Sequence, residues 1–248
     1  MPSCSITGFQ EWQMYQMKKQ IASFGFDVTC DEVARYGTDI VVSASKSVTS
    51  VTLCQLSWGN PVVHSEWIED SYNLGLLQDP FKYLQFKSVL RHRRNLDQYG
   101  IYGLQFSGLK AIFILKDLRK KKLLQDVFFC GGGDFVSAVD ESIEKTIDER
   151  KINMVFFDDQ VFSDCRYQMF LKLVNTFGKN NTVSFMHYSY IVMSLVNDSD
   201  VLNVHDYDIL NPRFGGLRKS FENKEINLMS ENEHNLTNEE FVTLEENI

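Results

Sequence analysis

Residues 59–75 have the pattern of a short apolar strand that bends directly into a helix. The strand covers residues 61–63, and the helix that follows carries Trp67 on its first turn. Because an α-helix repeats every 3.6 residues, Trp67 and Ser71 lie on one face of it. The segment therefore constrains the chain to a fold in which a strand is followed at once by a helix, as in α/β proteins.

Length and composition limit the number of domains and the class of protein. The chain has 248 residues, of which 44% are apolar, enough for one large domain or two of about 100 residues each. Its best apolar run, Tyr188 to Val196, is shorter than the roughly 18 to 20 residues that span a bilayer, and no secretory signal begins the chain. Five scattered cysteines without a Cys-x-x-Cys pair argue against a disulfide scaffold or a zinc site. We expect a soluble intracellular protein with reduced thiols and no membrane partner.

The net charge of −8 is unevenly distributed along the chain. From residue 215 onward eight Glu face three Lys and Arg, so this end holds five of the eight net negative charges. The nearly neutral remainder contains two basic clusters, at residues 91–94 and 119–122. Phosphate contacts need a local excess of cations, so the overall acidity argues against direct DNA binding.

The first part of the chain alternates between strand and helix patterns. Strands are predicted at 4–7, 26–29, 39–42 and 61–63, and helices at 11–24, 45–56 and 65–74. Ser45 or Ser47 is the expected N-cap of the middle helix. This order predicts a parallel sheet with helices on both faces.

The same order of elements returns after residue 109. Strands are predicted at 110–115, 135–139, 153–157 and 182–186, and helices at 120–130, 165–177 and 188–196. An offset of 123 residues places His64 over His187, Trp67 over Tyr190 and Ser71 over Ser194. The chain therefore contains an internal repeat whose second copy has lost the tryptophan.

Four regions follow from this repeat. We expect a first domain at 1–84, a polar linker at 85–107, a divergent second domain at 108–212 and an acidic tail at 213–248. The linker length suits two domains packed through a helical interface. The tail is rich in Asn and Glu and sparse in apolar residues, so it is predicted to be disordered or to form a helix only on binding.

The pattern Gly-x-Pro-Val-Val-x-x-x-Trp-Ile-x-x-Ser at residues 59–71 resembles the signature of BRCT domains, in which the Trp is a core residue. With the second copy, residues 1 to about 212 resemble a tandem BRCT pair of DNA-damage checkpoint mediators and repair scaffolds. The resemblance implies an α/β fold of two four-stranded parallel sheets flanked by helices. It further implies a nuclear, non-enzymatic module that binds a phosphoserine partner, such as a histone tail or a repair factor, without a cofactor.

The resemblance also implies where the phosphate would bind. The family uses a Ser or Thr followed by Gly at the end of the first strand, which Thr7 and Gly8 match. It also uses a Lys on the second helix, but Val51 stands at that position here, and Val48 replaces an Arg. A phosphate requires a cation beside its hydroxyl and backbone donors, so we assign Lys46 as the substitute.

Other polar groups have simpler interpretations. Residues 131–133 are glycines that predict a helix-ending turn rather than a phosphate cradle, and Asp158 with Asp159 is expected to be surface acid. His64 and His187 share one position before a helix, which favours packing or capping. No Ser or Cys has a His and Asp in a nucleophile motif, so we predict no enzyme and no metal site.

Two alternatives to phosphopeptide binding remain open from the sequence. The same fold serves as an assembly scaffold that binds a protein through the groove between repeats or through the tail. Direct binding to a DNA end or a nucleosome would use the basic clusters at 91–94 and 119–122. Loss of binding with salt would support the DNA interpretation, and loss on phosphatase treatment would support the phosphopeptide interpretation.

Overall fold

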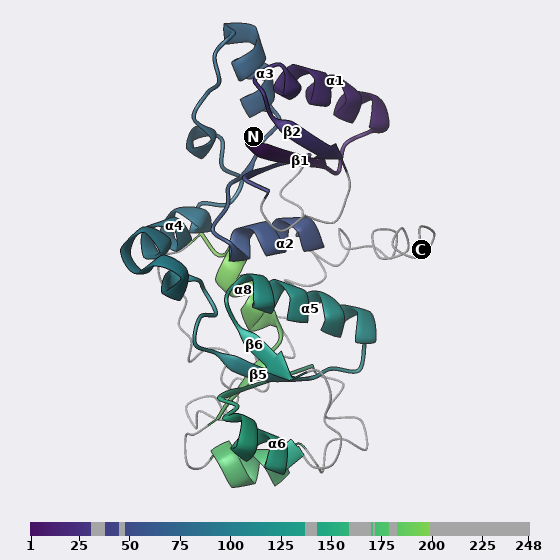
Figure 1. The fold of residues 1–248 in the computed structure, drawn as a ribbon. Coiled ribbons are helices and arrows are strands. Elements are labelled where there is room, and N and C mark those ends of the chain that lie inside the picture. Colours follow the sequence, from purple (N-terminus) through teal and green to yellow (C-terminus); the bar gives the residue numbers. More distant parts are fainter. Residues whose placement is uncertain are drawn as a thin grey trace.

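The computed structural model describes residues 1–30, 38–44, 48–136, 143–158, 170, 172–178 and 183–198. They form two four-stranded parallel sheets at opposite ends of the molecule, with helices α2, α4, α5 and α8 between them (Figure 1). Helices α1 and α3 cover the outer face of the first sheet, and α6 lies beyond the second (Figure 1). The fold class predicted from the sequence is confirmed.

The first repeat is built from β1–α1–β2–β3–α2–β4–α3. Its strands are β1 (Ser3–Thr7), β2 (Asp27–Cys30), β3 (Ile40–Ser43) and β4 (Val62–Val63), and its helices are α1 (Glu11–Ala22), α2 (Ser50–Ser57) and α3 (Glu66–Leu74). A short 3₁₀ turn, η1 (Pro80–Lys82), follows. The strand order β2-β1-β3-β4 places β1 inside the sheet, so both of its edges are paired.

The second repeat uses the same strand order, β6-β5-β7-β8. Its strands are β5 (Lys110–Ile114), β6 (Asp134–Val136), β7 (Met154–Phe157) and β8 (Ser184–His187), and its helices are α5 (Leu118–Cys130), α6 (Ile143–Arg150), the π-helical η4 (Val174–Gly178) and α8 (Ser189–Val196). Val42 pairs with both Ile6 and Val63, and Phe156 pairs in the same way with Phe113 and Met186. This register superposes Val63 on Met186, as the offset of 123 residues predicted.

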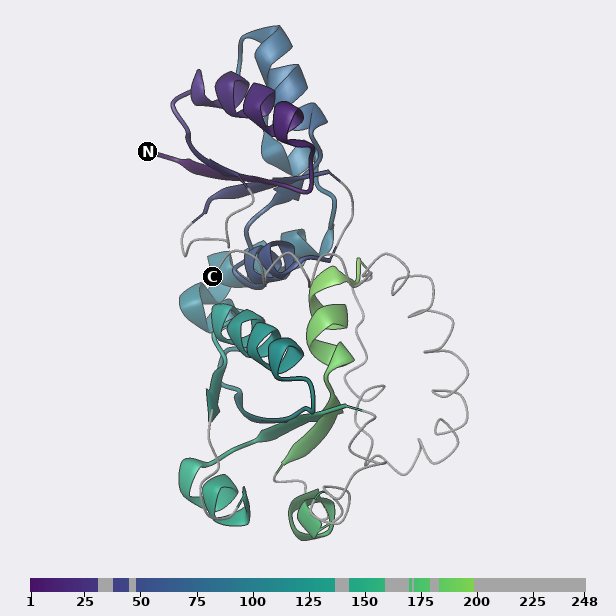
Figure 2. The ribbon, with the colours of Figure 1, turned by 90° about the vertical axis from the view of Figure 1, so that its right-hand side faces the viewer.

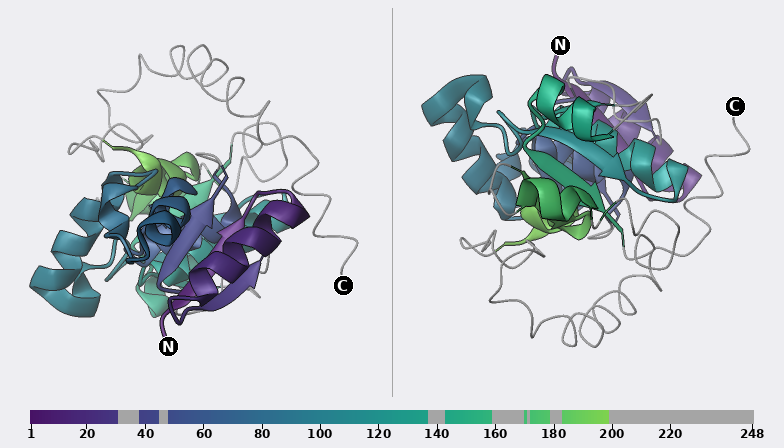
Figure 3. Two further views of the ribbon diagram at one scale, coloured as in Figure 1. Left: turned by 90° about the horizontal axis from the view of Figure 1, so that it is seen from above. Right: turned by 90° about the horizontal axis from the view of Figure 1, so that it is seen from below.

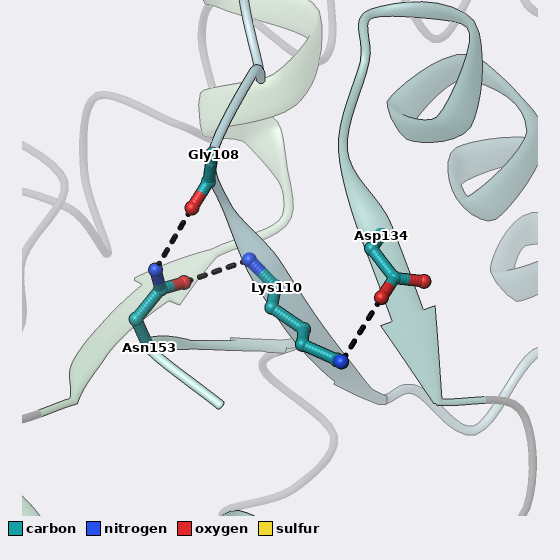
Figure 4. A network of polar contacts seen from close by, with 4 residues as sticks. All are labelled: Gly108, Lys110, Asp134 and Asn153. Carbon is teal, nitrogen blue, oxygen red and sulfur yellow. Dashed lines mark hydrogen bonds and ion pairs between the residues drawn. The ribbon is translucent and has the colours of Figure 1, made fainter. Parts of the chain in front are cut away.

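Both sheets are fastened at their amino ends by the same type of contact. In the first repeat Asp39 Oδ2 accepts the backbone N–H of Ser3 (2.7 Å). In the second, Asn153 Oδ1 accepts the backbone N–H of Lys110 (2.8 Å) and Asn153 Nδ2 donates to the Gly108 carbonyl (3.1 Å), as Figure 4 shows. Each side chain satisfies a donor at the start of the central strand that the ladder leaves unpaired.

Trp67 fills the core on the outer face of the first sheet. Its side chain is 0% exposed, and its ring meets Phe26 edge to face with centroids 5.9 Å apart. Its indole N–H donates to the Gln78 carbonyl (2.8 Å), while Ser71 Oγ donates to the Trp67 carbonyl (2.6 Å) and accepts from the Gln78 N–H (3.0 Å). The Trp and Ser of the sequence motif therefore hold α3 against the chain that leaves it.

A second core joins the two repeats. Helix α2 packs between α5, α8 and α4, as Figure 2 shows for α2, α5 and α8. Six of its eight residues are buried. The apolar cluster around it draws side chains from both sheets and from α4, α5 and α8. The repeats therefore share one continuous core.

The prediction that this helix begins at residue 45, capped by Ser45 or Ser47, is wrong. The helix starts at Ser50, and Thr49 is its N-cap, because Thr49 has an extended backbone and its hydroxyl accepts the N–H of Thr52 (3.2 Å). Residues 45–47 lie outside the described part of the chain.

The segment 85–107, predicted as a polar linker, is structured and contributes to the shared core. It forms α4 (Ser88–Tyr99) and a 3₁₀ turn, η2 (Gly100–Gly103), at one side of the molecule (Figures 1 and 3). Phe86, Val89, His92 and Phe106 are buried. The polar composition concealed this packing because only one stripe of α4 faces inward.

The remaining predictions concern the helices of the second repeat and the tail. Helix α5 ends at Cys130, with Gly131 as its C-cap and Gly132 at φ 81°, which confirms the helix-ending turn. Helix α6 was not predicted. The helix predicted at 165–177 is described only from Phe170, and the tail at 213–248 lies outside the described residues.

We expect the Trp67→Ala variant to lower the free energy of unfolding by about 3 to 5 kcal/mol, because it leaves a cavity in the first core. Trp12, which is 62% exposed on α1, provides the matched control. Urea unfolding of both variants measures the effect. A loss in Trp12→Ala as large as in Trp67→Ala would contradict the assigned core position.

Candidate functional site

Thr7 and Gly8 lie where the central strand of the first sheet ends. Thr7 pairs with Ser43 on β3, and its carbonyl accepts the N–H of Ala44 (3.1 Å). The carboxyl ends of parallel strands are where α/β folds commonly bind ligands. The predicted hydroxyl–glycine pair therefore occupies the edge of the sheet that suits a binding site.

The local geometry explains the glycine. Gly8 has φ 78°, a left-handed conformation that L side chains rarely adopt. A Cβ built there would lie 3.5 Å from the Ala44 Cβ, which is an ordinary contact, so backbone conformation rather than space requires glycine. The turn carries the chain from β1 into α1.

Thr7 is 8% exposed. Within residues 1–30, 38–44 and 48–136, no side chain or backbone group is hydrogen-bonded to its hydroxyl. A threonine hydroxyl can donate one hydrogen bond and accept two. One donor is thus available at the carboxyl end of β1.

Helix α2 supplies no cation to this edge. Val51, at the position where the resemblance expects Lys, is 8% exposed and belongs to the core shared by the repeats. Val48 packs against the same cluster. The face of α2 that would carry a charge is used for packing, which gives a physical reason for the departure from the family pattern. Lys46, assigned as the substitute, lies outside the described residues.

The second repeat has a different arrangement at the corresponding edge. Ile114 and Leu115 occupy the positions that are equivalent to Thr7 and Gly8 in the strand register, and both are buried. Asp158, expected to be surface acid, is instead 7% exposed and accepts the N–H of Lys116 through Oδ2 (2.9 Å). Because aliphatic side chains stand at both equivalent positions, the second repeat has no counterpart of the hydroxyl–glycine pair at this edge.

His187 lies beside this carboxylate. Its side chain is buried and its Nδ1 is 2.7 Å from Ser189 Oγ at the start of α8, so the packing role predicted for it is confirmed. His64 is exposed, so it does not share this packing role. Burial lowers the pKa of His187 to about 4, a shift that Asp158 opposes and Lys120 assists.

Part of the basic cluster at 91–94 makes contacts in the interior of the protein. His92 is buried, and its Nδ1 donates to the Leu56 carbonyl (3.0 Å); burial lowers its pKa. Arg91 Nη2 donates to the Ser194 carbonyl (3.1 Å) in the other repeat, and Arg93 pairs with Asp97. These residues connect α4 to both repeats.

The cluster at 119–122 also has partners close by. Lys120 Nζ lies 3.4 Å from the Tyr188 hydroxyl, and Lys122 pairs with Asp126 at 2.7 Å. Neither cluster therefore forms a continuous surface of unpaired cations.

No group of three or more His, Cys, Asp or Glu side chains in the described ranges is placed to hold a metal ion. None of the helices in the described part of the chain has the length and apolar character that crossing a bilayer requires.

We expect acid to destabilise the protein through His187, whose pKa is about 4 when folded and near 6.5 when unfolded. Well above pH 6.5 the histidine is neutral in both states and its contribution to stability is fully present. As the pH falls from about 7.5 to 5, the unfolded chain binds a proton that folded His187 does not, which costs on the order of 2 kcal/mol.

Urea unfolding at these two pH values, for the native chain and for His187→Gln, measures this contribution. The variant is expected to lose less stability between the two pH values. An equal loss in both proteins would show that other groups cause the acid sensitivity.

Solved structures of other proteins share this architecture. No model of a known protein family matches the sequence, and no curated protein sequence matches it. Among solved structures, the BRCT5–BRCT6 domains of S. pombe Brc1 superpose with a TM-score of 0.57 at 15% identity, over 80% of this chain and 94% of that chain. Yeast Rtt107, solved in complex with a phosphorylated histone, superposes with a TM-score of 0.51 at 14% identity, over 84% of this chain and 94% of that chain. The two repeats thus have the fold of a tandem BRCT pair, as the sequence resemblance predicted.

Proposed function

We propose that this chain is a non-enzymatic interaction module that binds a phosphorylated protein through its first repeat. Its ligand is a phosphoserine segment of a histone tail or of a repair or checkpoint factor, and its place of action is the DNA-damage response of the nucleus. The observation that carries the proposal is the Thr7–Gly8 pair at the carboxyl end of β1, with the Thr7 hydroxyl as donor.

Lys46 is the proposed cation of this site. The Ala44 N–H bonds to the Thr7 carbonyl, which fixes Ala44 beside the pair. Lys46 follows Ala44 by two residues in the sequence, a length of chain that spans at most about 7 Å. A lysine side chain from there can reach a phosphate held by Thr7.

The solved structures support the class of ligand. The yeast protein Rtt107, which shares the fold, was solved with a phosphorylated histone. The fold is therefore compatible with a phosphorylated histone tail as ligand.

The second candidate is a scaffold that binds a protein partner independently of phosphate, through the groove between repeats or the acidic tail. Val51 favours it, because its burial in the shared core removes the family's cation from the pocket.

Calorimetric titration with matched phosphorylated and unphosphorylated peptides, including a phosphoserine histone-tail peptide, distinguishes the two candidates. At roughly 150 mM salt we expect binding that is lost when the phosphate is removed. Equal binding of both peptides, or of neither, would contradict phosphate recognition and favour the scaffold.

The Thr7→Ala variant is expected to weaken phosphopeptide binding by roughly tenfold or more, because it removes a hydrogen bond to a charged group. Thr7→Ser keeps the hydroxyl and is expected to retain most of the affinity. If the two variants bind equally, Thr7 does not contact the phosphate.

Lys46→Gln is expected to lower the affinity by about 10- to 100-fold, the cost of losing a charge-assisted contact. Lys18→Gln, at an exposed position of α1, is the control for the loss of one positive charge. Unchanged affinity of Lys46→Gln would rule out Lys46 as the cation.

A further inference from the structure

Two cysteines from different repeats meet where α2 packs against α5. Cys54 belongs to α2, and Cys130 is the last residue of α5. Their thiols are close enough for a hydrogen bond, and the Trp58 side chain bonds to Cys130 as well. Cys54 is partly exposed, so a small solute can approach the pair, whereas Cys130 is buried.

The two helices approach closely at this point. One turn beyond the cysteines, Ser57 Oγ donates to the backbone carbonyl of Val127 (2.8 Å). Because a serine side chain is short, this bond requires the two backbones to be near each other. A Cβ built on Gly131 would lie only 2.7 Å from Ser57 Oγ, which shows the same tight fit. A disulfide needs Cα atoms within about 4.4 to 6.8 Å, the spacing of closely packed helices with small side chains.

The contact between the two thiols changes the pKa of each. The hydrogen bonds from Cys54 and then from Trp58 lower the pKa of Cys130 despite its burial. The bond to Cys130 and then burial raise the pKa of Cys54. Since the thiolate is the nucleophile, the thiol of the pair that ionises attacks an oxidant, and its neighbour is positioned to resolve the product.

We propose that Cys54 and Cys130 form a reversible disulfide that links the two repeats when the protein meets hydrogen peroxide. The thiolate of one cysteine attacks one peroxide oxygen, the O–O bond breaks, and the departing hydroxide takes up a proton to give water. The sulfur of the other cysteine then attacks the resulting sulfenic sulfur. The S–O bond breaks, and the departing hydroxide leaves as water with the proton of the second thiol. The two sulfurs lose two electrons in total, which reduce one peroxide to two waters.

The linkage would fix the arrangement of the repeats covalently. It joins residues far apart in the sequence and so restricts the unfolded chain, which stabilises the folded state. It involves neither Thr7 nor Lys46, so the test of this linkage is independent of the test of the proposed phosphate site.

The test treats the reduced, desalted full chain with hydrogen peroxide, blocks the remaining thiols and maps the disulfides by mass spectrometry. We expect an intramolecular Cys54–Cys130 linkage. The thermal midpoint of the oxidised chain should rise by roughly 5 to 10 °C and return to its starting value with dithiothreitol.

Three variants test the pairing of the thiols. Cys30→Ser, which removes a partly exposed thiol elsewhere, is expected to keep both the linkage and the thermal shift. Cys54→Ser and Cys130→Ser should lose both. Dimedone should trap a sulfenic acid at the remaining cysteine in at least one of these two variants, and its position identifies the thiol that attacks the peroxide.

Disulfide mapping on the native chain shows whether Cys54 and Cys130 are linked, even where a serine variant fails to fold. Peroxide treatment that yields only sulfinic acids would overturn the proposal, as would a linkage that forms equally fast in the urea-unfolded chain. A linkage without any thermal shift would show that it does not hold the repeats together.

Discussion

The structure depends on the burial of α2 between two sheets. Helix α2 belongs to the first repeat, yet six of its eight residues are buried and its apolar side chains join the core that both repeats share. It has no charged side chain, because a charge at this depth would have to be paired or neutralised. Val51 follows from the same constraint: a position in this core contributes apolar contact and cannot also carry a cation to the sheet edge.

Polar groups determine how the repeats fit together. His92 bonds to Leu56, Ser57 to Val127 and Arg91 to Ser194, each across a boundary between elements of the shared core. Apolar packing tolerates small rotations, but each of these bonds has a required direction and is costly to leave unmade when buried. The arrangement of the repeats is therefore set by directional contacts within an apolar interface.

The order of strands and helices was predictable from the sequence because it rests on local patterns and on one repeat. Trp67 and Ser71 marked the outer core for the same reason, as their spacing is a property of a single helix. The burial of α4 and of Asp158 was not predictable, since both depend on what packs against them: α2 and α8 in one case, Lys116 and His187 in the other. The N-cap of α2 was missed because serines and threonines crowd residues 45–52, and only the backbone geometry at Thr49 identifies the one that caps. For the binding site, Thr7 and Gly8 were found through a motif, whereas the source of the cation is not fixed by any local pattern.

The contacts of Asp39 and Asn153 have a consequence for how the two halves of the chain diverge. Each half closes the amino edge of its own sheet with a side chain from the residue before its third strand. Neither half therefore needs a contact from the other half at this edge. The opposite edges differ completely, with a threonine and a glycine in one half and buried aliphatic side chains beside a carboxylate in the other. A duplicated unit built in this way retains its architecture from one end while its chemistry changes at the other. The carboxyl edge of one copy can therefore change its chemistry while the contact that closes the amino edge of each sheet stays the same.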